Sequence, residues 1–369
     1  MILFLSIVFD AGTRLLILPI ITPGNRFVAL SAGIGRGHPN YLDSVLSFLP
    51  DVPRLTPPGP GWRLLRQLYR LGGRGGPLTG IYNRIRRSGT VSASVLSLLD
   101  PKLRKEFGSF PGIVLVDHPL LARLLAPVCR VVYLHGEIAA PKSAAIAEAE
   151  LILVPLEPTA RCFEALGISS ERVAVTGLII ESQLLARAET AFHSRLARCR
   201  TDQPLTVALF TSGAYPRPHM KALCLAARSC LDAGHRVLVF AGTEGRSAPR
   251  IPGTMVFPSR ADENEKTAEL LPEIDLMVAA AHERTNWALG LGLPMFTLLP
   301  HIGPFAPLNF TFAAEHGVCL PLSQPQKLGS IINTLRHAGR LAEMAQAGWG
   351  KFPITGTETA ARLLSSYLQ

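Results

Sequence analysis

The sequence predicts an α/β protein built from two doubly wound domains, each a mostly parallel sheet with helices on both faces. Three observations support this fold class. Short apolar, β-branched runs alternate with helix-like stretches, the alternation continues through two successive series, and a segment of different composition separates the series. The 369 residues are enough for two domains of ordinary size.

The candidate strands fall into two groups along the chain. The first series comprises the runs Phe27–Leu30, Gly112–Val116, Val131–Leu134, Leu151–Val154 and Val173–Val175. The second series comprises the runs Thr206–Phe210, Val237–Phe240, Thr254–Phe257, Leu276–Val278, Met295–Leu298 and Val318–Leu320. Because ligands bind beyond the carboxyl ends of the strands in open parallel sheets, we expect the functional site in a cleft where the two sheets face each other.

The domain limits follow from a change of composition near residues 182–204, where Arg and Ala replace β-branched residues. We expect an N-terminal domain over 26–190 and a C-terminal domain over 204–354. The remaining residues, 355–369, are expected to form a C-terminal helix that packs back on the first domain.

Residues 1–25 form an apolar segment of uncertain role. The runs Met1–Phe9 and Leu15–Ile21 are each too short to span a bilayer, and Asp10 and Arg14 interrupt the joined segment. A peripheral anchor, an extra edge element and a misassigned start codon all remain open.

The composition points to an anionic partner. The chain carries a formal net charge of +10 and has a pI near 9.6, which suits nucleic acid, a phosphorylated small molecule or an anionic membrane face. No nucleic-acid-binding motif is present, so we expect no nucleic-acid partner. The six cysteines form no CxxC pair and no zinc spacing, which is typical of reduced thiols in an intracellular protein.

A basic insertion interrupts the first domain at residues 53–99. It contains eight arginines and no Asp or Glu, and glycines near residues 72–77 separate two short amphipathic pieces. Arginines beside Trp, Tyr and Leu suit an interface rich in anionic lipid, and a solvated helical hairpin packed on the first domain has the same pattern. The residues expected at the membrane are Trp62, Arg63, Arg66, Tyr69 and Arg70.

The loop Ser31–His38 is the most informative single feature. It links an apolar run to a helix-like stretch, Tyr41–Leu49, and its glycines allow a tight turn and close approach of a ligand. Their spacing is not that of a dinucleotide-binding loop, and no Gly-Lys-Ser/Thr follows to make a P-loop. The histidine adds a group that can take or give a proton near neutral pH. The glycines of this loop are Gly33, Gly35 and Gly37.

Further strand ends carry polar residues that are expected to open on the same cleft. Asp117 and His118 follow one strand of the first series, and His135 and Glu137 follow the next. Adjacent residues at a strand end usually point apart, so we expect no direct pair between Asp117 and His118. In the second series, Thr211–Gly213 supplies hydroxyls and backbone donors at a strand end.

The order of these motifs over roughly residues 26–350 resembles the GT-B glycosyltransferases of the MurG and monogalactosyldiacylglycerol synthase type. The segments that carry the resemblance are Ser31–His38, Asp117-His118-Pro119, Val175-Thr176-Gly177-Leu178, Phe210-Thr211-Ser212-Gly213, Leu271–Leu276, Ala288–Pro294 and Asn309. The resemblance implies two Rossmann-like domains that face each other across a cleft, with a nucleotide-sugar held by the C-terminal domain.

The donor motif departs from the family pattern Ser/Pro-Gly-Gly-x-Thr-x-x-Glu, whose Glu grips the ribose of the nucleotide. Counting back from Pro294, Trp287 takes the place of that Glu. The donor side is therefore either specialised differently or weakened. The residues expected to bind the donor are Thr211, Ser212, Gly213, His282, Glu283, Arg284, Thr285, Asn286 and Asn309.

The resemblance implies an inverting, metal-independent hexosyltransferase. It would move a sugar from a nucleoside-diphosphate sugar, expected to be UDP-linked, to a lipid or lipid-linked acceptor. We expect a peripheral protein on the cytoplasmic face of the cell membrane, with no bound cofactor and no metal. The expected catalytic residues are His38, Asp117 and His118, and the expected acceptor-side residues are Gly33, Gly35, Gly37, His135 and Glu137.

Two other functions stay open at this point. Trp287 favours a non-catalytic or weakened relative that binds a nucleotide-sugar or a partner. A UDP-sugar epimerase or hydrolase on the same architecture would need a cluster of carboxylates in the cleft, for which Glu137 and Glu283 are the clear candidates.

Overall fold

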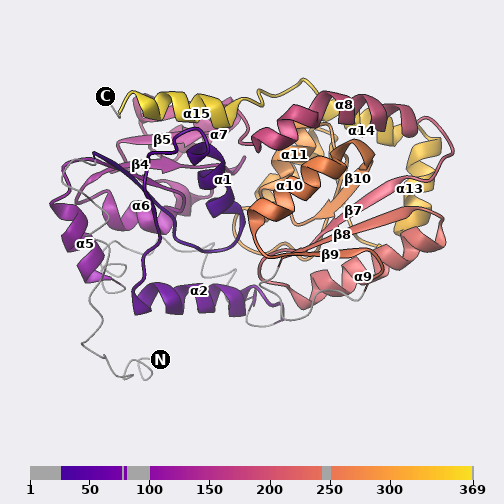
Figure 1. Ribbon diagram of the computed structural model, residues 1–369, viewed down its shortest axis with the longest axis horizontal. Helices are drawn as coiled ribbons and strands as arrows, with labels where there is room; N and C mark the ends of the chain where they lie inside the picture. The colour runs from indigo at the N-terminus through magenta and orange to yellow at the C-terminus, as the bar shows by residue number, and fades with distance from the viewer. Residues whose placement is uncertain (1–25, 77–78, 81–99, 243–250, 368–369) are drawn as a thin grey trace.

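Two six-stranded parallel sheets form the framework of the computed structural model, which describes residues 26–76, 79–80, 100–242 and 251–367 (Figure 1). Sheet A has the strand order β2-β1-β3-β4-β5-β6, and sheet B has the order β12-β11-β10-β7-β8-β9. Every neighbouring pair of strands is parallel. The predicted fold class, two doubly wound α/β domains, is therefore confirmed.

Each of the eleven predicted runs forms a strand whose ends lie within two residues of the expected positions. Sheet A contains β1 (Phe27–Leu30), β2 (Arg54–Leu55), β3 (Ile113–Val116), β4 (Arg130–Leu134), β5 (Leu151–Val154) and β6 (Val173–Val175). Sheet B contains β7 (Thr206–Phe210), β8 (Arg236–Gly242), β9 (Thr254–Phe257), β10 (Leu276–Ala279), β11 (Met295–Thr297) and β12 (Cys319–Pro321). The edge strand β2 was not predicted, because two residues are too few to show a periodic pattern.

Helices connect the strands and cover both faces of each sheet. Around sheet A lie α1 (Gly37–Leu46), α2 (Pro60–Gly72), α5 (Pro101–Gly108), α6 (Pro119–Leu125), α7 (Glu157–Ala165) and α15 (Gly356–Ser365). Around sheet B lie α8 (Ser182–Arg198), α9 (Arg217–Asp232), α10 (Arg260–Leu270), α11 (Arg284–Gly290), α12 (Ala306–Glu315), α13 (Leu328–His337) and α14 (Arg340–Gly348). Helix α1 begins four residues before the predicted stretch, so His38 lies in its first turn.

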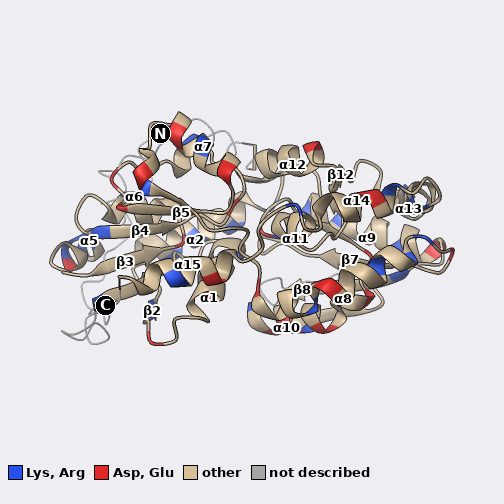
Figure 2. Cartoon of the chain, turned by 90° about the horizontal axis from the view of Figure 1, so that it is seen from above, with Lys and Arg blue, Asp and Glu red and all other residues tan. Residues whose placement is uncertain are grey.

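The core forms on both faces of each sheet because side chains alternate along the strands. In β1, Val28 and Leu30 join the apolar cluster that contains Phe107 and Phe163, whereas Ala29 faces the cluster under α1 and α15. Charged residues gather mainly on the helices and loops, and the strands are mostly uncharged (Figure 2). This burial on both faces explains why the strands are continuous apolar runs in the sequence.

The chain returns to the N-terminal domain at its end. Helix α15 packs against α1, with Ala360, Ala361 and Leu364 buried beside Tyr41 and Leu42 (Figure 1). The apolar segment expected over residues 1–25 and the second amphipathic piece of the insertion lie outside the described residues. Within the described ranges, no helix combines the length and the apolar character needed to cross a membrane.

Each sheet has one point where the strand order reverses. In sheet A it lies between β1 and β3, and in sheet B it lies between β7 and β10. The loops that leave neighbouring strands at such a point run in opposite directions, so they open a crevice at the carboxyl ends of the strands. The positions of these two crevices decide where a ligand can bind.

Candidate functional site

Both crevices open on one pocket between the domains. The N-terminal domain lines it with residues Ile34, Gly35, Arg36, Gly37, His38, Tyr69, His118 and Glu137. The C-terminal domain lines it with residues Phe210, Thr211, Ser212, Gly213, Ala214, Pro216, His219, Arg260, Ala279, Ala280, His282, Glu283, Arg284, Ile302, Gly303, Pro304 and Phe305. The space between these residues is about 930 Å³, including its opening to solvent.

The loop Ser31–His38, called the glycine loop below, lets two other parts of the protein approach its backbone closely. Gly35 has a φ of +72°, which glycine adopts without strain, and a Cβ there would lie 2.9 Å from the hydroxyl of Tyr69 on α2. A Cβ on Gly37 would lie 2.8 Å from a carboxylate oxygen of Glu283 in the C-terminal domain. The glycines therefore let α2 and the opposite domain pack directly against the loop. Gly33 is also left-handed, with φ +61°, and faces Arg66.

Asp117 was predicted to be catalytic, and the structure corrects this. The Ser31 hydroxyl donates to one of its carboxylate oxygens at 2.5 Å, and the Ala32 N–H donates to the other at 3.0 Å. The carboxylate is buried and does not line the pocket. Burial raises the pKa of Asp117 to about 6, although both hydrogen bonds favour the ionised form. Asp117 therefore anchors the start of the glycine loop to the end of β3.

His38 and His118 both line the pocket and lie against each other. Their ring centroids are 5.0 Å apart in an edge-on arrangement, and the Phe305 ring lies 5.5 Å from that of His38. The Nδ1 atom of His118 accepts the Leu120 N–H at 3.2 Å and caps α6, so Nε2 bears the proton of its neutral ring. The structure thus brings these two predicted residues together, and their catalytic roles stay predictions.

Glu137 lines the same wall as an almost fully buried carboxyl group. The Asn309 side-chain amide donates to one of its oxygens at 2.5 Å. Burial raises the pKa of Glu137 to about 8, with Glu283 adding to the shift and Asn309 opposing it. At neutral pH this carboxyl group is therefore mostly protonated and can donate a hydrogen bond or a proton to a ligand.

His135 was expected on the acceptor side of the cleft, but it does not line the pocket. Its Nδ1 atom lies 3.0 Å from the Tyr133 hydroxyl, and its Nε2 atom lies 3.2 Å from the Ala139 carbonyl. Its ring packs edge-on against Phe163, with the centroids 4.9 Å apart. Burial lowers the pKa of His135 to about 3, so this ring is a neutral part of the core.

On the C-terminal wall, the loop after β7 presents Thr211, Ser212 and Gly213 to the pocket as predicted for the donor side. The Thr211 hydroxyl donates to the Phe240 carbonyl at 3.3 Å, so it is engaged by β8. The Ser212 hydroxyl is buried and has no hydrogen-bond partner among the described residues. Their binding to a donor stays a prediction.

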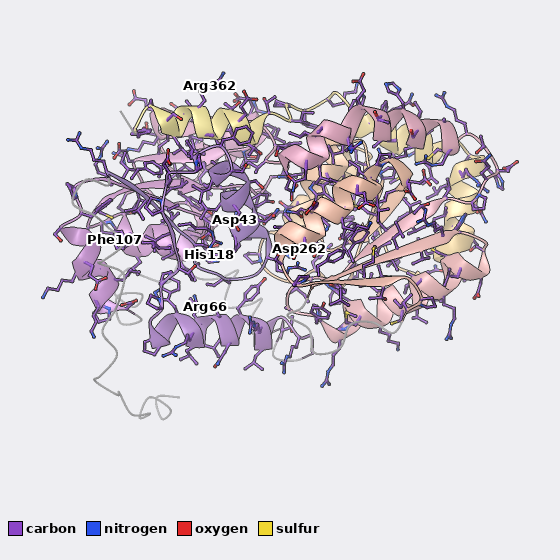
Figure 3. All side chains as sticks on the ribbon, in the orientation of Figure 1. Asp43, Arg66, Phe107, His118, Asp262 and Arg362 are labelled. Atoms are coloured by element: carbon purple, nitrogen blue, oxygen red, sulfur yellow. The ribbon has the colours of Figure 1, made fainter. Side chains whose placement is uncertain are left out.

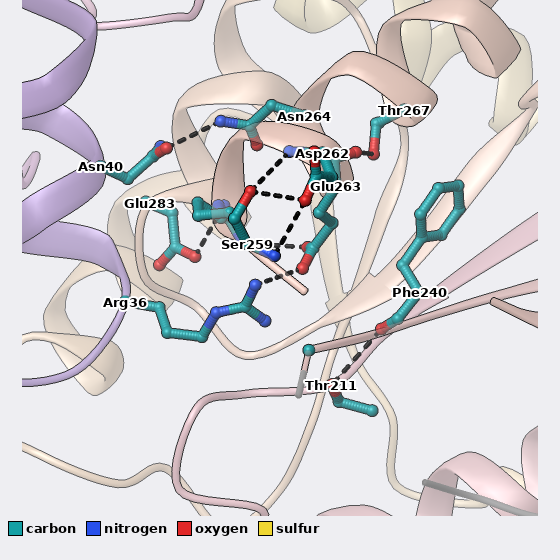
Figure 4. A network of polar contacts seen from close by, with 12 residues as sticks. Arg36, Asn40, Thr211, Phe240, Ser259, Asp262, Glu263, Asn264, Thr267 and Glu283 are labelled. Atoms are coloured by element: carbon teal, nitrogen blue, oxygen red, sulfur yellow. Dashed lines mark hydrogen bonds and ion pairs between the residues drawn. The ribbon is translucent and has the colours of Figure 1, made fainter. Parts of the chain in front are cut away.

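A cluster of alternating charges lies behind and along this wall (Figure 4). Glu263 pairs with Arg36 at 2.6 Å, with Arg260 at 2.9 Å and with Arg284. Glu283 pairs with Arg284 at 2.8 Å and with Arg260 at 3.2 Å. Burial alone would raise the pKa of Glu283, but the two guanidinium groups lower it to about 2. Three guanidinium groups thus share the two carboxylates of Glu263 and Glu283, and the buried Glu181 adds a further negative charge near Arg260.

Trp287, which the resemblance places at the position of a ribose-binding Glu, is a structural residue. Its indole N–H donates to Glu181 at 2.9 Å, and only 1% of its surface is exposed. Glu181 in turn accepts from the Asn40 amide at 2.7 Å. Glu283 lies one helical turn earlier and does line the pocket. The pocket therefore has a carboxylate, but at a different position from the family motif.

Thr285, Asn286 and Asn309 were predicted to bind the donor, but none of them lines the pocket. The Asn286 amide donates to the Gly136 carbonyl at 3.2 Å, and the Asn309 side-chain oxygen accepts the Ala139 N–H at 3.2 Å. Both contacts cross from one domain to the other, while Thr285 is fully buried. Asn286 and Asn309 therefore fix the two domains against each other.

Three basic side chains of the pocket were missed or not assigned from the sequence. Arg36 lies inside the glycine loop, Arg260 is the first residue of α10 after β9, and His219 lies in the first turn of α9. Burial lowers the pKa of His219 to about 4, and its Nε2 atom lies 2.8 Å from the Pro300 carbonyl. A basic residue directly after a strand end is the signal that could have identified Arg260. His282, which was predicted, lines the pocket with Nε2 3.1 Å from the Ile302 carbonyl.

Helix α2 forms one border of the pocket through Tyr69. Arg66 on α2 donates to the Ala32 carbonyl of the glycine loop at 3.1 Å (Figure 3). Trp62 is only 1% exposed and belongs to the core, so its predicted membrane contact is wrong. Arg63 and Arg70 are exposed, as a surface contact requires.

The described residues show no group of three or more His, Cys, Asp or Glu side chains that could hold a metal ion.

No protein-family model matches the chain, and no curated protein matches it in sequence. Solved structures match its fold over nearly the whole length. LpCGTa in complex with UDP has a TM-score of 0.55 at 12% identity, over 93% of this chain and 99% of that one. The spinosyn rhamnosyltransferase SpnG has a TM-score of 0.54 at 13% identity, over 93% and 100%. A Listeria monocytogenes protein assigned as a UDP-N-acetylglucosamine 2-epimerase has a TM-score of 0.54 at 13% identity, over 92% and 95%.

These similarities show the fold. The chain has the GT-B fold, in which two Rossmann-like domains face each other across a cleft. At such low identity the fold alone does not specify the reaction, which must be argued from the residues of the pocket.

Proposed function

We propose that this protein is an inverting, metal-independent glycosyltransferase that uses a nucleoside-diphosphate sugar. The observation that carries the proposal is the convergence of both crevices on one pocket, with His38 on one wall and Ser212 and Gly213 on the other. This arrangement can hold an acceptor hydroxyl and a donor diphosphate against each other. UDP is the nucleotide we expect, because structures of similar fold contain it.

In the proposed reaction, the acceptor oxygen forms a bond to the anomeric carbon while the bond from that carbon to the diphosphate oxygen breaks. Attack opposite the leaving group inverts the anomeric configuration. His38 takes the hydroxyl proton as general base, and the ring of His118 supports its orientation. Backbone N–H groups of the loop after β7 stabilise the negative charge that develops on the diphosphate by donating hydrogen bonds to it. The guanidinium groups of the nearby cluster would supply the positive charge that a metal ion supplies in other transferases.

We propose a lipid or lipid-linked acceptor that is met at an anionic membrane surface, with the protein peripheral on the cytoplasmic face. Leu64, Leu68 and Leu71 on α2 are 51%, 53% and 46% exposed. Their spacing of four and three residues puts them on one face of the helix, beside the exposed Arg63 and Arg70. An apolar stripe with flanking arginines suits shallow insertion between anionic headgroups. Because Tyr69 of the same helix borders the pocket, a lipid acceptor would enter close to the surface.

The transfer is tested by incubating the purified protein with a set of nucleoside-diphosphate sugars and a lipid extract. We expect release of the nucleoside diphosphate together with a labelled glycolipid, and no labelled lipid with His38→Ala. Absence of a thermal shift with every nucleoside diphosphate at millimolar concentration would support a non-catalytic relative instead.

The membrane contact is tested with liposomes. We expect sedimentation of the protein with anionic vesicles that weakens at high salt and is reduced by serine substitutions at Leu64, Leu68 and Leu71. Leu231→Ser on α9 is the matched control, because Leu231 is similarly exposed at 42%. Equal binding to neutral and anionic vesicles would contradict the proposed surface.

A UDP-sugar epimerase or hydrolase is the second candidate, and one observation favours it. Glu137 and Glu283 line the same pocket, one mostly protonated and the other ionised at neutral pH. Such a pair can serve as an acid and a base. Conversion or hydrolysis of a UDP-sugar without any acceptor, followed by NMR, would select this function over transfer.

A further inference from the structure

Arg36 belongs to the N-terminal domain, but its side chain lies on the C-terminal domain. It leaves the glycine loop, crosses the boundary and donates from Nη2 to Glu263 on α10 at 2.6 Å (Figure 4). Only 10% of the side chain is exposed, and it lines the pocket. The loop that bears His38 is thus connected to the opposite domain through one residue.

Two glycines of the C-terminal domain make room for this side chain. A Cβ on Gly213 would lie 2.7 Å from Arg36 Cγ, and a Cβ on Gly242 would overlap the guanidinium group. Neither glycine has a φ in the left-handed region, so the backbone does not require glycine at these positions. The space they leave is shaped for an arginine that comes from the other domain.

Several buried donors around the pocket are unsatisfied. Arg36 Nη1, Arg260 Nε, Arg284 Nε and the Ser212 hydroxyl have no hydrogen-bond partner among the described residues. All four side chains line the pocket. A buried donor without a partner destabilises the protein, and guanidinium groups cannot accept hydrogen bonds or lose their proton. The group that satisfies this set is therefore an anion with several oxygens.

We propose that Arg36 completes a diphosphate site that is shared between the domains. Arg36 approaches from the acceptor side, Arg260 and Arg284 from the donor side, and Ser212 from the loop after β7. Glu263 holds the three guanidinium groups together, and the donors that Glu263 and Glu283 do not engage stay open to a ligand. This inference rests on the proposed use of a nucleoside-diphosphate sugar.

The shared site links the two substrates. Arg36 and His38 are two residues apart on one loop, so a diphosphate that binds Arg36 also fixes the position of His38. Donor binding would therefore order the acceptor wall, and the donor would bind before the acceptor.

The test measures binding of UDP, inorganic pyrophosphate and uridine by titration calorimetry. We expect Arg36→Ala to weaken UDP and pyrophosphate at least about tenfold, the equivalent of 1.4 kcal/mol, and to leave uridine unchanged. Arg36→Lys is expected to retain part of the affinity, because lysine keeps the charge but loses the planar donors. Arg340→Ala is the matched control, since Arg340 pairs with Glu343 on the exposed surface of α14.

A second variant keeps the test valid if Arg36→Ala folds poorly. Gly213→Ala retains Arg36 but places a methyl group against it, so we expect the same selective loss of the two phosphate ligands. Unchanged pyrophosphate and UDP affinity in both variants would overturn the shared site and leave the proposed function standing. Arg36-dependent binding of pyrophosphate without any binding of UDP would support the site and contradict the proposed nucleotide donor.

Discussion

The N-terminal and C-terminal walls of the pocket can be compared directly, because both are made by loops at the carboxyl ends of parallel strands. The N-terminal wall presents His38, His118 and a Glu137 whose pKa is raised to about 8, so it carries little negative charge at neutral pH. The C-terminal wall presents Arg284 and an ionised Glu283 whose pKa is lowered to about 2. The strands beneath the two walls are equally apolar and equally buried.

This difference shows that the chemical properties of the pocket come from the loops and not from the strands. Both sheets satisfy the same packing demand, so their strands resemble each other, whereas the loops beyond them are unconstrained by the core. Beside Arg36, the N-terminal wall has imidazole and carboxyl groups, which can take or give a proton, whereas the C-terminal wall has the ion-paired Arg260, Glu283 and Arg284. Four predictions test this difference between the walls.

The largest effect is expected at the proton-exchanging wall. His38→Ala should lower turnover by about 10²–10⁴-fold, because it removes the proposed base, while the dissociation constant of the donor stays nearly unchanged. Steady-state kinetics and donor titration measure the two quantities separately. An unchanged turnover would remove His38 from catalysis.

The charged wall should lose stability when its central carboxylate is removed. Glu263→Ala leaves Arg36, Arg260 and Arg284 buried beside one carboxylate, and we expect a loss of about 3–5 kcal/mol in the free energy of unfolding. Urea denaturation of the variant and the wild type measures this difference in the free energy of unfolding. Glu150→Ala is the control, since Glu150 pairs with Arg130 at the exposed surface and should contribute only about 0–1 kcal/mol. Equal losses for the two variants would show that the cluster is not stabilising.

Trp287→Phe tests whether the altered donor motif still serves ligand binding. The variant keeps a ring in the core but removes the indole donor from one oxygen of the buried Glu181, which should cost about 1–3 kcal/mol of stability. UDP affinity should stay unchanged, because Trp287 does not line the pocket. Trp349→Phe, whose ring stacks on Phe192 at 4.6 Å, is the matched control. A selective loss of UDP affinity would return Trp287 to the donor site.

The smallest effect, per pH unit, is expected in the free energy of unfolding. Its pH dependence should have opposite signs for the carboxyl groups of the two walls. The raised pKa of Glu137 means that its contribution to stability is present below pH 4.5 and is lost as pH rises through about 8. The lowered pKa of Glu283 means that its contribution is present above pH 4.5 and is lost as pH falls through about 2.

Each slope approaches about 1.4 kcal/mol per pH unit inside its window. Both slopes can be measured by chemical denaturation at a series of pH values. The proteins compared are the wild type, Glu137→Gln and Glu283→Gln. Glu137→Gln should remove the loss on the alkaline side, and Glu283→Gln should remove the loss on the acid side. The same slope in wild type and Glu137→Gln would show that this carboxyl group is not protonated in the folded protein.

Much of the framework could be predicted because it is local. The strands are apolar runs, and glycines at a strand end mark a tight turn, so β1 and the loop to His38 were found together. The loop after β7 was found in the same way. Prediction failed where one residue serves a distant partner: Asp117, Asn286 and Asn309 have the polar character of site residues but bind backbone or side chains of other elements.

Residue type also could not tell which side of an element a side chain faces. Trp62 and Arg66 were both expected at a membrane, but they lie four residues apart on the inner face of α2, where the first is core and the second binds the glycine loop. Glu263 had no sequence signal at all, because a glutamate inside a polar helix is typical of a solvated surface. It became the centre of a charge cluster only through the approach of Arg36 from the other domain.

The sequence by itself determined the two α/β domains, since alternation of apolar strands and helices leaves few other ways to bury those strands. It also placed His38 at a strand end. Only the tertiary structure decided that Arg36 lies on the C-terminal domain, that Glu283 rather than Trp287 offers a carboxylate to the pocket, and that Glu137 keeps its proton. The physical reason is that charge and burial at a site depend on groups more than a hundred residues apart, which a local pattern does not record.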